Sequence, residues 1–424
     1  MSNQNNQSTV GPMIIISSLF FIFGFVTWLN SLLIPYLRIA CELSEVQSYF
    51  VTFAFYIAYL VMAPVSTWVL NKFGFKNGMA VALGIMAFGA LLFIPAAYTR
   101  TYLLFLSGLF VMGGGLAILQ TASNPYITII GPVETAAKRI SILGICNKLA
   151  GAIATTLFSY LLKVDEVDKL QNEILSLSPA EKSTALDNMA LEVVNPYIGI
   201  IVVLLILAFW ISKTHLPEVK GDEEEDAQHH NLTESKQSIF DFPHVLLGFV
   251  ALFAYVGVEV LAGDTIIAYG KYLGIPLATA SFFPWITMLS MVAGYIIGII
   301  AIPKYLNQET ALKLCAILGI IMTIGIVFTD GILSLALVGL LGLANSLVWP
   351  AIWPLALKGV GKFTSATSGI LVMGIAGGAV IPLLYGQLAH VTNSHQAYWI
   401  ALPCYLFILY YAISGHKVRK KTHA

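Results

Sequence analysis

Long apolar stretches separated by short polar turns recur from the beginning of the chain to its end. A helix needs about 20 apolar residues to cross the hydrocarbon core of a bilayer. The pattern predicts twelve such helices, over residues 13–35, 47–70, 78–97, 102–126, 140–162, 197–212, 244–270, 279–302, 310–328, 332–357, 365–389 and 396–415. It is typical of an all-α membrane protein that crosses the bilayer many times.

Two longer polar stretches interrupt this series. Residues 163–196 are amphipathic and of mixed charge, whereas residues 213–243 contain an acidic run and the pair His229-His230. A run of like charges is normally solvated and flexible, and a histidine pair there is more often exposed to solvent than bound to a metal. We therefore expect an N-terminal six-helix half at 1–212, a cytoplasmic linker at 213–243 and a C-terminal six-helix half at 244–424.

The two halves look like copies of one unit. FGFVTWLNS at 23–31 aligns with VGVEVLAGD at 256–264, with Gly24 on Gly257 and Ser31 on Asp264. The fourth and tenth predicted helices carry corresponding segments, QTASNP at 120–125 and WPAIWP at 349–354. The repeat predicts two pseudo-symmetric six-helix bundles with a substrate site between them, near the midplane of the bilayer.

Composition supports this class and excludes others. Hydrophobic residues make up 58% of the 424 residues and charged residues 10%, against about 25% charged residues in soluble domains. The net charge is zero, which argues against nucleic-acid binding. The four cysteines form no metal-binding or disulfide spacing. Because no P-loop and no nucleophile–base arrangement stands out, we expect neither ATP drive nor an enzyme.

Lys and Arg are distributed unevenly between the two sets of loops. The loops after odd-numbered predicted helices hold six of these residues, whereas the other loops and the C-terminal tail hold fifteen. Cytoplasmic loops carry the excess of Lys and Arg. We therefore expect both termini in the cytoplasm.

Three charged residues lie deep inside predicted membrane helices: Lys148, Glu259 and Asp264. Placing each at the bilayer centre costs about 2.5–3.5 kcal/mol on insertion scales, and such residues normally mark a substrate or ion path. One cation against two carboxylates leaves a surplus negative charge, which must bind a proton or a metal cation. A static salt bridge that locks two helices together is the alternative.

Glu259 and Asp264 are five residues apart, which separates them by about 140° around an ideal helix. They can reach one spot only if the helix breaks, and Gly263 is the expected place for that break. Unwound backbone can also supply carbonyl ligands to Na⁺. The two carboxylates are therefore candidate ligands for Na⁺ or carriers of H⁺, with Lys148 as their counter-charge.

Uncharged polar groups and tryptophans accompany these charges. An amide side chain both donates and accepts hydrogen bonds, which suits sugar hydroxyl groups, and an aromatic face packs against the apolar face of a sugar ring. For any single residue, helix packing is an equally good explanation. The candidate sugar contacts are Asn30, Gln120, Asn124, Asn147 and Trp349.

Several segments together resemble one family. FGFVTWLN at 23–30, LQTASNPY at 119–126, GICNK at 144–148, YVGVEV at 255–260 and MGIAGG at 373–378 are similar to the fucose–galactose–glucose:cation symporter family of the major facilitator superfamily. The most similar branch is that of the bacterial glucose/galactose transporters. The resemblance implies a twelve-helix fold of that superfamily.

The resemblance also bears on site residues. In fucose–proton symporters of this family, coupling and recognition use two carboxylates, at positions matching Ser31 and Gln120. Both positions are uncharged here, whereas the family's amide at Asn147 is retained. Glucose-type members, some of them driven by Na⁺, often have the glutamine and an acid where Glu259 stands. The family assigns no role to Lys148 or Asp264.

The sequence therefore predicts a symporter, coupled to Na⁺ or H⁺, that imports a hexose such as glucose or galactose by alternating access. It would work as a monomer surrounded by lipid in the bacterial inner membrane, without a cofactor beyond the co-transported cation. The alternatives are an N-acetylglucosamine or fucose permease, an uncoupled facilitator, an exporter of sugars or drugs, and a sugar sensor without transport.

Overall fold

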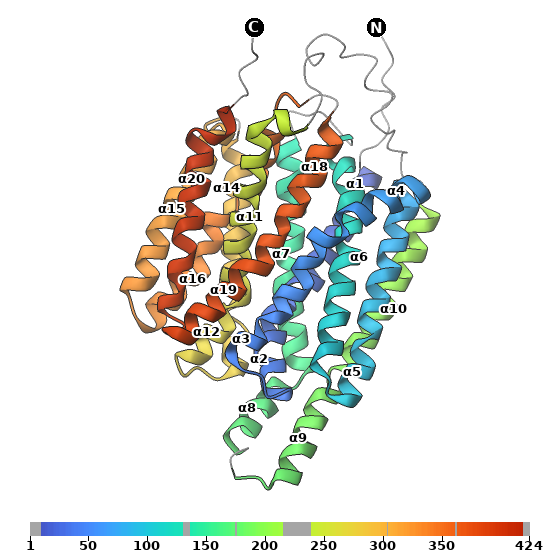
Figure 1. Cartoon of the computed structure of the whole chain (residues 1–424), viewed down its shortest axis with the longest axis vertical. Helices are drawn as coiled ribbons and strands as arrows, with labels where there is room; N and C mark the ends of the chain where they lie inside the picture. The colour runs from blue at the N-terminus through green and yellow to red at the C-terminus, as the bar shows by residue number, and fades with distance from the viewer. Residues whose placement is uncertain are drawn as a thin grey trace.

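A computed structural model describes residues 10–129, 136–173, 176–214, 239–302, 304–360 and 363–418. Every regular element in these ranges is an α-helix or a short 3-10 helix. The long helices pack side by side in one bundle (Figure 1). Helix α1 (Val10–Trp28) begins and helix α20 (Ala401–Ile413) ends at the same end of it, as expected for an even number of crossings (Figure 1).

We call residues 10–214 the N-terminal half and residues 239–418 the C-terminal half. After α1, the N-terminal half contains α2 (Asn30–Ala40), α3 (Glu45–Ser48), α4 (Phe50–Leu91), α5 (Phe93–Thr99), α6 (Tyr102–Ile129), α7 (Ala136–Leu161), α8 (Val164–Glu173), α9 (Pro179–Leu191) and α10 (Val194–Lys213). Helices α8 and α9 come from the predicted polar stretch 163–196 and project beyond the end of the bundle opposite the termini (Figure 1).

The C-terminal half begins with the 3-10 turn η2 (Ile239–Asp241). It continues with α11 (Pro243–Asp264), α12 (Ile266–Tyr272), α13 (Leu277–Ala280), α14 (Pro284–Ala301), α15 (Gln308–Phe328), α16 (Gly331–Asn345), α17 (Val348–Leu357), α18 (Thr364–Met373), η4 (Gly374–Ala376), α19 (Gly377–Val391), η5 (Gln396–Ile400), α20 and η6 (Gly415–Lys417). Most of the predicted linker, at 215–238, lies outside the described residues.

Eleven helical segments of the described chain are long and apolar enough to cross a membrane. One of them, Phe50–Thr99, has 50 residues, or about 75 Å of helix against a hydrocarbon core of about 30 Å. Inside α4, Gly74 has φ 72° and ψ 169°, a conformation that glycine adopts readily and other residues do not. The chain turns back there and crosses again, so these segments provide the twelve expected crossings.

Large apolar side chains face outward on the bundle. Examples are Ile206 and Phe209 on α10, Ile300 on α14 and Phe328 on α15, which are 61%, 67%, 65% and 75% exposed. Extensive apolar surface of this kind is unusual on a soluble monomer, and it fits contact with lipid chains.

Each half contains a close helix–helix contact that leaves no room for a side chain. A Cβ atom on Gly24 of α1 would lie 1.9 Å from the carbonyl oxygen of Asn147 on α7, and one on Gly377 of α19 would lie 1.8 Å from that of Phe253 on α11. The first and fifth crossings of each half thus approach each other through a glycine. The contact also fixes where Asn147 and its neighbour Lys148 lie relative to α1.

We expect Gly24→Ala to destabilise the protein, because the added methyl must push α1 away from the backbone of α7. Overpacking of this kind costs about 1–3 kcal/mol. Thermal unfolding of the purified protein in detergent, followed by intrinsic fluorescence, measures the change. Gly84→Ala is the matched control, since a Cβ atom there meets nothing within 4 Å. Equal unfolding temperatures for the two variants would contradict the contact.

The first helix of each half is interrupted. In the N-terminal half the break is at Leu29, between α1 and α2, and in the C-terminal half it is at Thr265, between α11 and α12. The expectation of a break at Gly263 is wrong, because Gly263 lies within α11. At Thr265 the side-chain Oγ1 donates to the carbonyl of Leu261, 2.6 Å away, and bonds with the Tyr398 hydroxyl at 2.7 Å. These side-chain bonds, rather than glycine flexibility, accompany the break.

Candidate functional site

A cavity lies between the two halves. It encloses about 1020 Å³ of empty space, a volume that includes the part open to solvent. Its lining comes from both halves: Phe20, Phe23, Thr27, Trp28, Tyr56, Tyr59, Gln120, Ile140, Gly144, Asn147 and Lys148 from the first, and Tyr255, Val256, Glu259, Val260, Tyr295, Trp349, Trp353 and Ile375 from the second.

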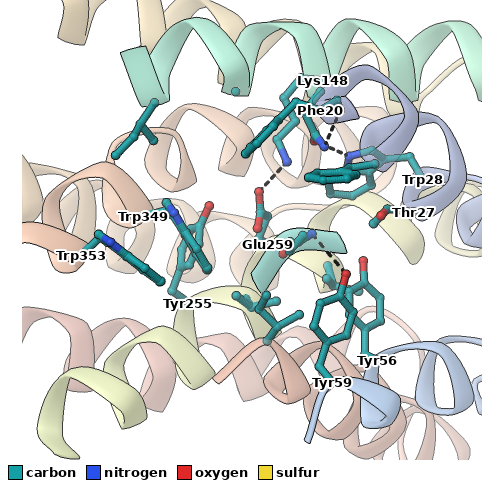
Figure 2. A pocket seen from close by; sticks show the side chains of 18 of the residues that line it. Phe20, Thr27, Trp28, Tyr56, Tyr59, Lys148, Tyr255, Glu259, Trp349 and Trp353 are labelled. Carbon is teal, nitrogen blue, oxygen red and sulfur yellow. Dashed lines mark hydrogen bonds and ion pairs between the residues drawn. The ribbon is translucent and has the colours of Figure 1, made fainter. Parts of the chain in front are cut away.

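A buried ion pair joins the halves at this cavity. Lys148 Nζ on α7 lies 2.7 Å from Glu259 Oε1 on α11, and the two side chains point at each other (Figure 2). Their side chains are only 7% and 11% exposed. A buried charge needs a partner because its desolvation is costly. Each of these two charges therefore depends on the opposite half of the molecule.

Trp28 and Asn147 complete the surroundings of Lys148. The ammonium lies 4.4 Å from the centroid of the Trp28 ring, within the range of a cation–π interaction. Trp28 Nε1 donates to Asn147 Oδ1 at 3.2 Å, and Asn147 Nδ2 donates to the carbonyl of Phe20 at 3.3 Å. The Asn147 amide is thus oriented by α1 at the edge of the cavity.

Aromatic residues form the opposing walls (Figure 2). Trp349 and Trp353 stack with their centroids 5.2 Å apart and their planes at 21°, and Tyr255 lies 6.4 Å from Trp349. On the other side, Gln120 Nε2 donates to the Tyr59 hydroxyl at 3.1 Å. The cavity therefore offers aromatic faces, amides and hydroxyls around one ion pair, an arrangement that can hold a small polar ligand with an apolar face.

Asp264 lies elsewhere. It is 0% exposed and is not among the residues that line the cavity. Its Oδ2 accepts a hydrogen bond from Thr52 Oγ1 of the N-terminal half at 3.2 Å, and its Oδ1 has no hydrogen-bond partner among the described residues. Asp264 is thus the carboxylate that Lys148 leaves without a cationic partner.

The structure brings most of the expected site residues together. Gln120, Asn147, Trp349, Lys148 and Glu259 all line the cavity. Asn30 does not: it follows the break at Leu29, is 0% exposed, and neither polar atom of its side chain has a hydrogen-bond partner among the described residues. The side chain of Asn124 lies outside the described part of the structure.

No group of three or more His, Cys, Asp or Glu side chains that could hold a metal ion occurs among the described residues. The expected pairing of Glu259 with Asp264 at one cation is not observed, since Glu259 bonds to Lys148 and Asp264 bonds to Thr52. The 140° separation on a continuous helix accounts for this, because it directs the two carboxylates to different faces of α11.

Four tyrosines are among the lining residues that were not predicted from the sequence. Tyr56 and Tyr59 line the cavity from α4, Tyr255 from α11 and Tyr295 from α14. A signal was present for three of them: Tyr56 and Tyr59 are three residues apart, and Tyr255 precedes Glu259 by four. Both spacings place side chains on one face of a helix. Nothing comparable marks Tyr295.

Known proteins resemble the chain over nearly its whole length. The sequence model of the Major Facilitator Superfamily matches residues 16–382. A glucose/galactose transporter of Brucella abortus biovar 1 (strain 9-941) is 34% identical over 404 residues, which cover 94% of this chain and 92% of that protein. The L-fucose-proton symporter of Escherichia coli (strain K12) is 28% identical over 412 residues, covering 96% and 93%.

Solved structures agree with this similarity. A crystal structure of a point variant of the Escherichia coli fucose:proton symporter superposes with a TM-score of 0.74 at 26% identity, covering 96% of this chain and 98% of that one. The superfamily model spans most of the chain, and a relative with more than 30% identity aligns along almost all of it. The chain therefore belongs to the Major Facilitator Superfamily, in the group of sugar transporters that its sequence motifs indicated.

Proposed function

We propose that this chain is a proton-coupled symporter that imports a hexose such as glucose or galactose by alternating access. The observation that carries the proposal is the cavity between the halves, with the Lys148–Glu259 pair at its centre and a second buried carboxylate, Asp264, outside it. The relatives named as glucose/galactose transporter and L-fucose-proton symporter support a cation-coupled sugar symporter.

Sugar is the ligand class that the cavity fits best. We assign hydroxyl recognition to the amides of Gln120 and Asn147, which already exchange hydrogen bonds with Tyr59 and Trp28, and keep Asn124 as a third candidate. Trp349, stacked on Trp353, offers the aromatic face for the apolar side of the ring. Asn30 is not part of this set, because its side chain is enclosed and does not line the cavity.

The charge balance supports coupling to a cation. Lys148 neutralises Glu259, so Asp264 is the group that must gain a proton or a metal ion when it is enclosed. Two backbone oxygens near the helix break already accept hydrogen bonds: Leu261 O accepts from Thr265 N and Oγ1, and Ala262 O accepts from Thr287 Oγ1 at 3.3 Å. The relatives named L-fucose-proton symporter favour H⁺ over Na⁺ as the coupling ion.

We place the protein in the bacterial inner membrane as a monomer, with both termini in the cytoplasm. The excess of Lys and Arg on the side of the termini supports this orientation. Helices α8 and α9, at the opposite end of the bundle (Figure 1), then face the outside of the cell.

Uptake of labelled glucose into proteoliposomes tests the proposal. With an acidic exterior and no Na⁺, we expect accumulation that a protonophore abolishes, and an imposed Na⁺ gradient without a pH gradient should drive none. Unlabelled galactose should compete with the labelled glucose for uptake. Mannose, N-acetylglucosamine and fucose are tested as competitors in the same way. Competition by fucose or N-acetylglucosamine alone would identify the corresponding permease instead. Equilibration without a response to either gradient would indicate a facilitator and refute the coupling.

A further inference from the structure

The Trp28 side chain sits between one helix of its own half and one of the other. It is the last residue of α1 and only 2% exposed, although it contributes to the cavity wall (Figure 2). A Cβ atom on Gly151 of α7 would lie 2.4 Å from Trp28 Cδ1, and one on Gly263 of α11 would lie 2.1 Å from Trp28 Cζ3. The indole thus fills a notch that two glycines, one from each half, keep open.

The Trp28 indole contacts two polar residues of the cavity, one through its N–H edge and one through its face. Nε1 bonds to Asn147, and the ring lies against the Lys148 ammonium. The backbone around the ring is held by Ser31, whose Oγ donates to the Trp28 carbonyl at 2.7 Å across the break at Leu29. One rigid side chain therefore connects the expected sugar and charge site to Gly263 of the opposite half.

The contacts beyond Trp28 hold the two halves together toward the α8–α9 end. Trp28 packs in a small cluster with Ala152, Met288 and Trp285. Further along α7, Thr156 Oγ1 accepts from Trp285 Nε1 at 2.6 Å, and the hydroxyls of Ser159 and Ser281 lie 2.9 Å apart. The bundle is closed between the halves here.

Helix α8 adds a contact between the halves at the same end. Both carboxylate oxygens of Asp168 accept from the first backbone N–H groups of α13, those of Leu277 and Ala278, at 2.9 and 2.8 Å. The cavity lining on α7 runs the other way, from Lys148 toward Ile140 near the start of that helix. The cavity is thus sealed at the α8–α9 end, with Trp28 as the innermost layer of the seal.

We propose that Trp28 is the gate residue that closes the outer end of the cavity by seating in the notch at Gly263. This inference rests on the proposed alternating access. When the halves separate at the α8–α9 end, α11 moves away from Trp28, and the ring becomes part of the wall of an outward-open cavity. On closure the ring seats against Gly263, directly before Asp264, so the sugar site and the surplus carboxylate are enclosed in one movement.

Disulfide formation tests this gate without requiring transport. Cysteines in place of Ser159 and Ser281 can form a disulfide when the outer end is closed, because the native hydroxyls are in contact. The four native cysteines are free thiols in the described structure, so they add the same background of thiol labelling to every variant. Labelling of remaining thiols with a PEG-maleimide after denaturation reports the rate of disulfide formation under mild oxidation.

In this cysteine-pair protein, we expect Gly263→Ala to slow disulfide formation by about tenfold, because the added methyl overpacks the closed state alone. Gly151→Ala, which presses the ring toward α11 from the other side, is a second variant with the same expected direction. Adding Trp28→Phe should restore the rate in both, since the smaller ring vacates the notch. Gly84→Ala, where the methyl meets nothing within 4 Å, should leave the rate unchanged.

Disulfide formation at the parental rate in both glycine variants would overturn the gate. Failure of Trp28→Phe to rescue either variant would also overturn it, because the effect would then not act through the ring. The parental protein could fail to transport sugar while the glycine variants still slow disulfide formation and Trp28→Phe still restores it. That result would refute the proposed function but support the gate.

Discussion

Glu259→Gln is expected to reduce gradient-driven sugar accumulation by about 100-fold or more. The substitution leaves the Lys148 ammonium buried with no carboxylate partner, and removing one member of a buried pair costs roughly 3–5 kcal/mol. It also removes the only ionic tie between α7 and α11 that the described residues contain. Initial uptake and final accumulation in proteoliposomes with an acidic exterior measure the effect.

Glu192→Gln is the matched control for this prediction. Glu192 also pairs with a lysine, Lys163, at 2.8 Å, but the two side chains are 35% and 50% exposed. Exposed pairs contribute about 0–1 kcal/mol, so uptake should stay near the parental level. A Glu259→Gln protein that accumulates sugar like this control would contradict a functional ion pair.

The double variant Lys148→Gln/Glu259→Gln separates a structural lock from a transport role. Removing both charges avoids the unpaired buried ion, so thermal stability should recover relative to Glu259→Gln alone. If the pair acts in transport, accumulation stays low despite this recovery. If the pair only locks the helices together, sugar accumulation recovers along with thermal stability.

Asp264→Asn is expected to uncouple transport rather than abolish it. Asparagine has the same shape, and its Oδ1 can still accept from Thr52 Oγ1, so the contact between the halves is kept. It has no ionisable proton, so the halves can close without taking one up. Sugar counterflow between equilibrated compartments should persist, whereas accumulation against a gradient should be lost.

Asp187→Asn provides the control for Asp264→Asn. Asp187 pairs with Arg100 at 3.3 Å on the outer surface, and its side chain is 55% exposed, so both accumulation and counterflow should be retained. An Asp264→Asn protein that accumulates sugar as the parent does would exclude Asp264 as the proton carrier. Loss of counterflow together with accumulation would assign Asp264 to closure of the halves instead.

The membrane crossings could be predicted from sequence because hydrocarbon imposes a minimum apolar length on each helix. The same rule made Lys148, Glu259 and Asp264 conspicuous, since a charge inside an apolar run is rare and costly. The expected meeting of the two acids at one cation was wrong, because the helix continues through Gly263 and keeps them apart: Glu259 faces the cavity and Asp264 does not. The sequence could not reveal which acid pairs with Lys148, because that depends on how two helices from different halves lie together.

The expectations for Gly263 and Asn30 were wrong, and the cavity tyrosines were not predicted, each for a specific physical reason. Gly263 was expected to be a flexible point in the helix. A glycine is needed there because the Trp28 ring occupies the space that a side chain would fill. Asn30 belongs to the same membrane crossing as cavity residues, but its side chain faces an enclosed position outside the cavity. The tyrosines of the cavity were overlooked because spacings of three or four residues place side chains on one face of a helix but do not tell whether that face meets the other half.

Sugar-induced proton movement tests the central claim most directly. Parental proteoliposomes in lightly buffered, Na⁺-free medium, without any imposed gradient, receive glucose while the external pH is recorded. We predict a transient alkalinisation as protons enter with the sugar, its absence in the presence of a protonophore, and its absence in Asp264→Asn vesicles that still take up glucose. Entry of labelled glucose into parental vesicles with no change in external pH would contradict proton-coupled symport.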